Sequence, residues 1–196
     1  MNFLKAKEFL MPKLERELNP NLFYHGAHHT RQVIASSIRI AKNEGISEPE
    51  LLLLKTAALF HDSGFLYTYR GHEAASVQIS RESLPQFGYD SQSIDIIGEL
   101  IISTQLPQCP TTFLAEILCD ADLDYLGGDK DKFLQIAESL YLELKGLEMV
   151  KNEEEWDKIQ INFLSNHKYF TKYCQLTREP RKQKNIDLIR KVTWDT

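Results

Sequence analysis

A histidine followed directly by an aspartate is the clearest sign of chemistry in this sequence. His61 and Asp62 end an apolar stretch that is typical of a buried helix, and Ser63 and Gly64 follow them. Burying a carboxylate beside an imidazole costs several kcal/mol unless a partner compensates both groups. A divalent cation does this well, because imidazole nitrogen and carboxylate oxygen are ligands that first-row metals accept. The pair therefore predicts part of a metal site.

Two further residues are candidates for the rest of the ligand set. His29 shares a predicted helix face with Val33 and Ile40, and this face is expected to turn towards the core. In the segment 118–124, carboxylates alternate with apolar residues, and Asp122 has the most apolar immediate neighbours of the three aspartates. The simpler alternative is that each residue is an ordinary hydrogen-bonded side chain. The predicted metal ligands are His29, His61, Asp62 and Asp122.

These residues, in this order, resemble a known family. The chain carries Tyr24-His25, His29-Thr30 with Val33, His61-Asp62-Ser63-Gly64, and Ala121-Asp122-Leu123. The pattern is similar to the signature of the HD superfamily of metal-dependent phosphohydrolases, in which His, His-Asp and Asp, in that order, bind the metal. The resemblance covers about residues 24–128. Within the superfamily, the tract Asp120–Gly127 (DADLDYLG) looks like a group of small predicted phosphohydrolases.

The resemblance implies a bound divalent metal ion, whose identity is open among Mn, Mg, Co, Ni, Zn and Fe. Members of the superfamily with two metals place additional histidines between the His-Asp pair and the last aspartate. This chain has only His72 in that interval. We therefore expect one metal ion in the site.

Residues near the His-Asp pair are candidates for the reaction itself. Attack of water on phosphorus needs a proton acceptor and positive partners for the developing charge. We predict catalytic roles for Asp62, Glu73 and His72, with Glu73 orienting or deprotonating the water. We predict substrate contacts from His25 and Arg70. The simpler alternatives are a helix-dipole role for Glu73, a place in the first helical turn for His72, and a role at the helix entry for His25.

The remaining histidines and several aromatic residues have structural explanations. His28 points about 100° away from the His29 face, and His167 lies beside Lys168, so both are expected on the surface. The aromatic residues that flank or follow the His-Asp pair either stack on a nucleobase or close the core. They are Phe60, Phe65, Tyr67 and Tyr69.

Helices must position all of these residues, because strand signals are nearly absent. Ser47 and Glu50 have the spacing of a capping box, which predicts a helix start. Helices are predicted at about 2–17, 27–44, 47–60, 72–86, 91–104, 112–120, 130–148, 153–175 and 184–191. We expect a single all-α HD-type domain over residues 1–196, with the motif-bearing core at about 24–128 and a helical C-terminal extension at about 129–196.

Composition limits the partners. The chain has 196 residues, 42% of them hydrophobic, and a net charge of −5 with no basic block, which argues against polymeric nucleic acid. Its apolar runs are far shorter than a membrane span, so no membrane contact is expected. The three cysteines lack a C-x-x-C spacing and are interpreted as buried thiols in a reducing compartment, which favours a cytoplasmic location. A homodimer is left open.

The sequence thus predicts a metal-dependent phosphohydrolase acting on a small soluble phosphate ester, with a nucleotide as the favoured substrate class. Two alternatives come from other functional classes. One is a non-catalytic module that senses or binds a nucleotide on the same fold. The other is a metal-dependent oxygenase, which generally requires two irons and is disfavoured by the few histidines between the His-Asp pair and Asp122.

Overall fold

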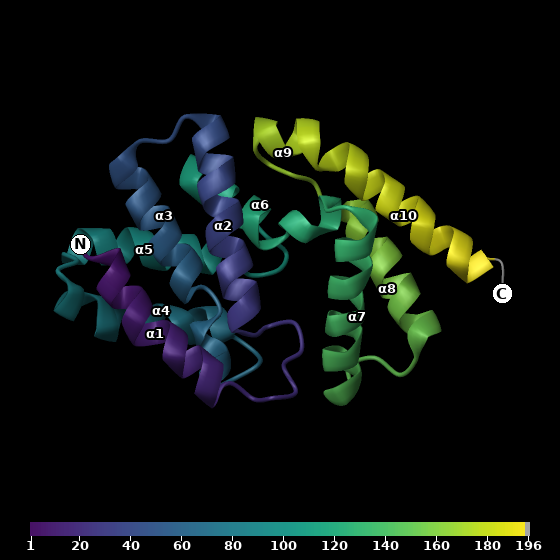
Figure 1. Cartoon of the computed structure of the whole chain (residues 1–196), viewed down its shortest axis with the longest axis horizontal. Coiled ribbons are helices and arrows are strands. Elements are labelled where there is room, and N and C mark those ends of the chain that lie inside the picture. Colours follow the sequence, from purple (N-terminus) through teal and green to yellow (C-terminus); the bar gives the residue numbers. More distant parts are fainter. Residues whose placement is uncertain (195–196) are drawn as a thin grey trace. The chain divides into compact units, whose positions relative to one another are not determined.

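The computed structural model describes residues 1–194 and consists of helices joined by loops, which confirms the predicted all-α class (Figure 1). No strand occurs within this described range. The chain divides into two compact units. The first unit contains Met1–Pro20 and His25–Asp122, and the second contains Asn21–Tyr24 and the chain from Leu123 onwards.

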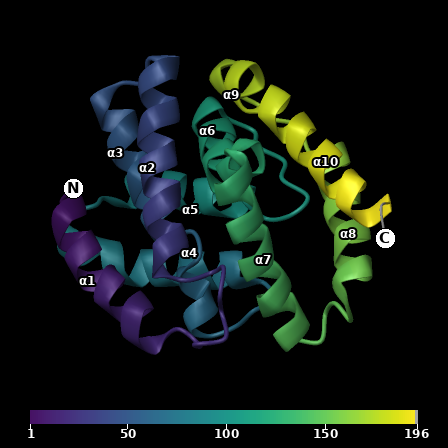
Figure 2. The ribbon, with the colours of Figure 1, turned by 45° about the vertical axis from the view of Figure 1, so that its right-hand side comes forward.

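The first unit is a bundle in which α2 and α3 lie side by side and run in opposite directions (Figures 1 and 2). α6 packs against α2, and α5 packs against both α3 and α4. The helices are α1 (Phe3–Glu17), α2 (Ala27–Glu44), α3 (Glu48–Phe60), α4 (His72–Ser83), α5 (Ser91–Ser103) and α6 (Phe113–Asp122). Two short 3₁₀ turns, η1 (Ser63–Leu66) and η2 (Leu84–Phe87), precede and follow α4.

Local sequence signals account for the two helices that position the histidine ligands. α2 has the predicted bounds and ends at Gly45, whose φ of 73° is a left-handed conformation that glycine adopts without strain. α3 begins with the predicted capping box, in which Ser47 N donates to Glu50 Oε2 at 3.1 Å. The apolar second half of α3, from Thr56 to Phe60, is fully buried. The His61-Asp62 pair therefore emerges from the core of the unit.

The second unit is built on α7 (Lys130–Gly146), α8 (Glu153–Asn166), α9 (Lys172–Thr177), α10 (Glu179–Trp194) and the 3₁₀ turn η3 (Asp124–Gly127). Tyr141, Val150 and Trp156 form a small core between α7 and α8. α10 packs against α8, α9 and η3 (Figure 2). The backbone N–H of Tyr24 donates to the buried Glu143 carboxylate at 2.8 Å, which holds the short segment 21–24 on this unit.

Two predicted helices in the second unit have the wrong bounds. The helix predicted over 153–175 is interrupted between Asn166 and Lys172. The break brings Tyr169 into the core, where it is 2% exposed, and Thr171 caps the start of α9. The helix predicted at 184–191 begins instead at Glu179, because Pro180 lies in the first helical turn, where its missing N–H costs nothing.

Two smaller predictions are also wrong. Cys109 is exposed, whereas Cys119 and Cys174 are buried as predicted. His167 is half-buried beside Lys182, whose Nζ lies 3.4 Å from His167 Nδ1 and donates to the His167 carbonyl. Lys182 itself is 2% exposed and pairs with Glu179 at 2.9 Å. Periodicity could not reveal these environments, because they arise from contacts between separate segments.

The turn at residues 123–128 is held by side chains from far along the second unit. Arg178 binds the Asp124 carboxylate through Nε at 2.6 Å. Tyr169 Oη accepts from Gly127 N at 2.9 Å and donates to the Leu123 carbonyl at 3.1 Å. Asn185 Nδ2 donates to Leu126 O at 2.9 Å and to Gly128 O at 3.3 Å. The second half of the DADLDYLG tract, from Leu123 to Gly127, is therefore anchored by the C-terminal segment of the same unit.

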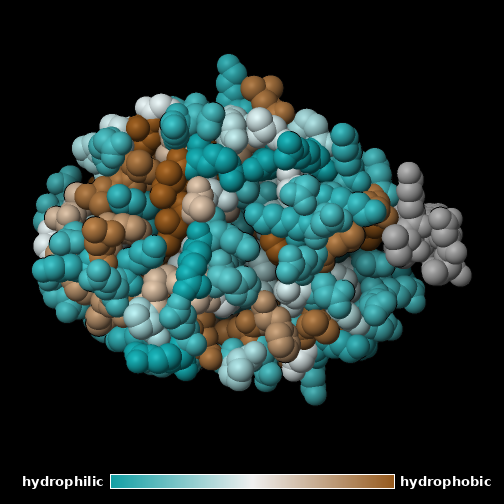
Figure 3. Space-filling view, viewed as in Figure 1, coloured by the Kyte–Doolittle hydropathy of each residue, from teal (hydrophilic) through white to brown (hydrophobic). Residues whose placement is uncertain are grey.

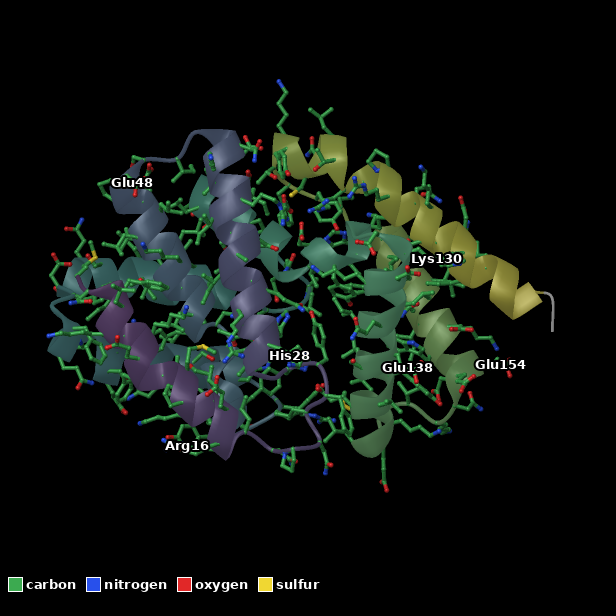
Figure 4. The ribbon with its side chains drawn as sticks, in the orientation of Figure 1. Arg16, His28, Glu48, Lys130, Glu138 and Glu154 are labelled. Carbon is green, nitrogen blue, oxygen red and sulfur yellow. The ribbon has the colours of Figure 1, made fainter. Side chains whose placement is uncertain are left out.

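The face of the molecule seen in Figure 3 is mainly hydrophilic. Figure 3 shows hydrophilic residues over most of one face, with hydrophobic residues in separate patches. Charged side chains such as Glu48 on α3 and Glu154 on α8 point away from the ribbon (Figure 4). No helix in the described part of the chain combines the length and the hydropathy needed to cross a membrane.

We predict that Arg178→Ala destabilises the second unit by about 3 kcal/mol, because it leaves the buried Asp124 carboxylate without its cation. Thermal and urea unfolding followed by circular dichroism would measure the loss. Arg181→Ala, at an exposed arginine in the first turn of α10, is the matched control. The double variant Asp124→Asn/Arg178→Met should be more stable than Arg178→Ala. Equal stability of wild type and Arg178→Ala would contradict this account.

A second prediction concerns pH. Burial, aided by the charge of Lys182, lowers the pKa of His167 to about 4. The unfolded chain therefore takes up a proton at His167 near pH 6.5, whereas the folded chain does not until about pH 4. Folding should lose up to about 3 kcal/mol from this group as the pH falls between these values, with no further loss below. Urea unfolding at a series of pH values should show a weaker pH dependence in His167→Gln, and an unchanged one in His28→Gln.

Candidate metal centre

Three separate helices of the first unit bring the predicted ligands together. His29 lies in the first turn of α2, His61 is the residue at which α3 ends, and Asp122 is the last residue of α6. His29 is 3% exposed and His61 is 1% exposed. Because α2 packs on both α3 and α6, the side chains meet inside the bundle. The neighbouring His28 is exposed, as predicted (Figure 4).

The donor atoms of these three residues converge. His29 Nε2 lies 3.1 Å from Asp122 Oδ1, and His61 Nε2 lies 3.5 Å from the same oxygen. The two Nε2 atoms are 3.4 Å apart. All three donor atoms lie within 4.8 Å of one another, an arrangement that could hold a metal ion. Within the described residues, no other group of histidine, cysteine or acidic side chains meets this condition.

Asp62 adds a fourth donor. Its Oδ2 lies 3.2 Å from His61 Nε2 and 3.4 Å from His29 Nε2, but neither contact has hydrogen-bond geometry, so this buried oxygen has no hydrogen-bond partner. A buried carboxylate oxygen without a partner is costly. His61 Nδ1 lies 2.9 Å from the Ala58 carbonyl, and a hydrogen bond donated there leaves the Nε2 lone pair for a cation. The donor set therefore fits a divalent metal ion.

The charges of the cluster favour a cation as well. Burial lowers the pKa of His61, but Asp62 and Asp122 outweigh burial and hold this pKa well above its ordinary value. Burial raises the pKa of the two carboxyls, but the neighbouring imidazoles outweigh it and keep both values below the ordinary range. At neutral pH the metal-free cluster thus keeps both carboxylates charged and a proton on His61. A divalent cation satisfies the same carboxylates and releases that proton.

The predicted catalytic residues lie at one side of the cluster. His72, the first residue of α4, has its Nε2 3.5 Å from Asp62 Oδ1 and 3.6 Å from Glu73 Oε1. His72 Nδ1 lies 3.1 Å from the Tyr69 carbonyl, the acceptor that fixes the orientation of the ring. Glu73 is buried, with 7% of its surface exposed. The structure therefore places both residues beside Asp62.

The two predicted substrate contacts have different positions. The His25 ring lies 6.1 Å from the His29 ring, centroid to centroid, and so borders the cluster. Arg70 is exposed in the loop before α4, and no contact of its side chain with the cluster occurs among the described residues. The structure brings His25 to the site but not Arg70.

The main contact that sequence analysis missed is made by Phe65. Its ring stacks on the imidazoles of His72 and His25, with centroid distances of 3.9 Å and 4.3 Å. Phe65 is 7% exposed and Phe60 is fully buried, whereas Tyr67 is 79% exposed. Phe60 and Phe65 therefore close the core rather than offer a free face to a nucleobase. The position of Phe65 directly after His-Asp-Ser-Gly was the one available signal.

Comparisons with known proteins agree with the all-α fold and with the resemblance to the HD superfamily. The sequence profile of the family described as HD domain matches residues 26–124. A structure described as a predicted HD superfamily hydrolase from an uncultured Thermotogales bacterium has a TM-score of 0.61 and 18% identity, covering 98% of this chain and 92% of that one. The structure of Bacillus subtilis YpgQ in complex with ADP has a TM-score of 0.68 and 18% identity, covering 100% of this chain and 97% of that one. The comparison with curated proteins gave no significant match.

We predict that His29→Ala lowers the affinity for Mn²⁺ at least about 100-fold, because it removes one of four converging donors. Isothermal titration calorimetry of the metal-free chain with Mn²⁺ would measure the affinity. His28→Ala, which changes the adjacent exposed histidine, should bind Mn²⁺ like the wild type. In wild type, Mn²⁺ at 100 times its dissociation constant should stabilise the fold by about 2.7 kcal/mol. Unchanged binding in His29→Ala would remove this residue from the ligand set.

Proposed function

This chain belongs to the HD domain family, and on that premise we propose that it is a metal-dependent phosphohydrolase acting on a small phosphate ester, most suitably a nucleotide. The observation that carries the proposal is the convergence of His29, His61 and Asp122 on one point, together with the unpartnered Asp62 oxygen. Two imidazoles and two carboxylates balance the charge of one divalent cation. Such a site retains affinity for an anionic phosphoryl group, which a more acidic ligand set would repel.

A divalent cation held there supplies a polarised phosphoryl oxygen and a water whose pKa is lowered towards neutrality. The residues of the chain provide the remainder. Glu73 is the buried carboxylate next to the cluster that is not among the predicted ligands, and we assign it the orientation or deprotonation of the attacking water. His72 lies within 3.6 Å of Glu73 and 3.5 Å of Asp62, where it can share that proton. Asp62 holds the cation and orients His72.

We assign substrate recognition to His25, at the border of the cluster, and to Arg70, in the loop before α4. His25 is half-buried, and its partial exposure lets it meet a phosphate that approaches from solvent. Arg70 would have to reorient to reach the same phosphate. Support for a nucleotide comes from the neighbour YpgQ, whose structure contains ADP. The acidic chain, with a net charge of −5, supports a small substrate rather than a nucleic acid.

The proposal is tested by loading the metal-free chain with Mn²⁺, Mg²⁺, Co²⁺, Ni²⁺ or Zn²⁺ in turn and measuring phosphate release from nucleoside mono-, di- and triphosphates and other phosphorylated metabolites. We expect turnover with at least one metal. Glu73→Gln should lower kcat about 100-fold and leave Mn²⁺ affinity unchanged, because it removes a proton acceptor and no predicted ligand. Glu82→Gln, an exposed acid on the same helix, is the control.

Two other results would replace the proposal. Nucleotide binding without release of phosphate or pyrophosphate by any metal form would indicate the sensing module. Two irons per chain with oxygen consumption would indicate the oxygenase. Elemental analysis of the purified protein distinguishes the metal contents before any assay.

A further inference from the structure

The 3₁₀ turn η1 is pressed against the first turn of α4. A Cβ atom on Gly64 would lie 2.0 Å from the His72 carbonyl oxygen and 2.9 Å from Ala75 Cβ, so glycine alone permits this approach. The Gly64 N–H donates to the buried Ser76 hydroxyl at 2.8 Å, which ties the turn to α4 a second time. The backbone of η1 therefore fixes the position of His72 at the start of α4.

The next residue, Phe65, contacts both imidazoles that border the cluster. Its ring plane is within 20° of the His72 ring and within 29° of the His25 ring. Tyr69 completes the group. Its ring makes edge-to-face contacts with Phe65 and His25, at centroid distances of 5.2 Å and 6.0 Å. Aromatic stacking restricts the rotation of the last side-chain torsion of a histidine, which is otherwise broad. A single ring thus restrains two histidines that come from different segments of the unit.

The restraint matters most for His72. Its Nδ1 faces the Tyr69 carbonyl at 3.1 Å, and its Nε2 faces Asp62 Oδ1 at 3.5 Å. A 180° flip of the imidazole would put carbon atoms in place of both nitrogens and break both contacts. Stacking on Phe65 holds the ring plane in which both contacts are made. Without the stack, the hydrogen bond to the Tyr69 carbonyl and the longer contact with Asp62 would be left to orient the ring.

We propose that Phe65 is a positioning residue, whose ring holds the imidazoles of His72 and His25 in the orientation that the reaction uses, without itself touching metal or substrate. The proposal rests on the function proposed above, because that function assigns roles to both histidines. It differs from a purely space-filling role for Phe65 in one respect. Replacing a space-filling residue would lower stability and Mn²⁺ affinity together. Replacing a positioning residue would change the orientation of the two imidazoles and lower kcat.

Three variants test this proposal. Phe65→Leu keeps an apolar side chain and removes the stacking ring, and Phe65→Tyr keeps the ring. Phe87→Leu is the matched control, because Phe87 on η2 also belongs to an aromatic pair, with Phe9 at 5.5 Å, but stacks on neither histidine. For each variant, NMR of the imidazole C–H groups reports the environment of His25 and His72, calorimetry reports Mn²⁺ affinity, and steady-state kinetics separates kcat from KM.

In Phe65→Leu we expect the Overhauser contacts of the His25 and His72 imidazole C–H groups, which report ring orientation, to change from those of a single orientation to an average over several. Loss of the upfield shift alone would show only that the stacked ring has been removed. We expect kcat to fall about tenfold, with Mn²⁺ affinity within a factor of two of wild type. Phe65→Tyr should restore both the signals and kcat, and Phe87→Leu should change neither. Unchanged Overhauser contacts of the His25 and His72 rings in Phe65→Leu would overturn the proposal, and so would a loss of Mn²⁺ affinity as large as the loss of kcat.

The two proposals can fail separately. If the wild-type chain hydrolyses no phosphate ester, the proposed function fails, and the imidazole signals still decide whether Phe65 orients the histidines. If the chain is active and Phe65→Leu retains full kcat, the positioning role fails and the phosphohydrolase remains.

Discussion

The requirement to compensate one buried and one half-buried carboxylate and two buried imidazoles within a few ångströms governs the first unit. Asp62 and Asp122 approach the same pair of Nε2 atoms, and an oxygen of Asp62 has no hydrogen-bond partner. Bringing such groups out of water is favourable only if a cation or a proton balances them. The packing of α2 on α3 and α6 is what brings the four side chains together, so the fold and the charge balance depend on each other.

The His-Asp-Ser-Gly-Phe segment serves this centre in more than one way. His61 and Asp62 contribute donor atoms, Gly64 permits the close approach to α4, and Phe65 stacks on the two bordering histidines. Five consecutive residues thus link the end of α3 to the start of α4. Four of the five residues therefore act on the centre, two as donors and two by fixing η1 against α4 and the bordering histidines.

The turn at residues 123–128 of the second unit is also fixed by contacts with distant residues. Asp124 and Gly127 follow the last predicted ligand in sequence. Asp124 binds the side chain of Arg178, and Gly127 donates to Tyr169 and lies against the Arg178 backbone. Two of the three alternating aspartates of the DADLDYLG tract therefore have different roles. Asp122 faces the imidazoles, and Asp124 pairs with Arg178. This division accounts for the spacing of the two aspartates.

The sequence by itself determined the all-α class, the bounds of α2 and α3, the inward face of His29 and the set of residues that meet at the cluster. The class, the helix bounds and the face of His29 follow from capping residues and helical periodicity, which depend on neighbours three or four positions away. The set of residues at the cluster follows from the His-Asp pair, the apolar neighbours of Asp122 and the resemblance to the HD superfamily. Only the tertiary structure decided the stacking of Phe65 on His25, the half-buried state of His167 and the break before α9. Each of these depends on residues that lie far apart along the chain, such as Tyr169 and Leu123, and local patterns carry no record of such contacts.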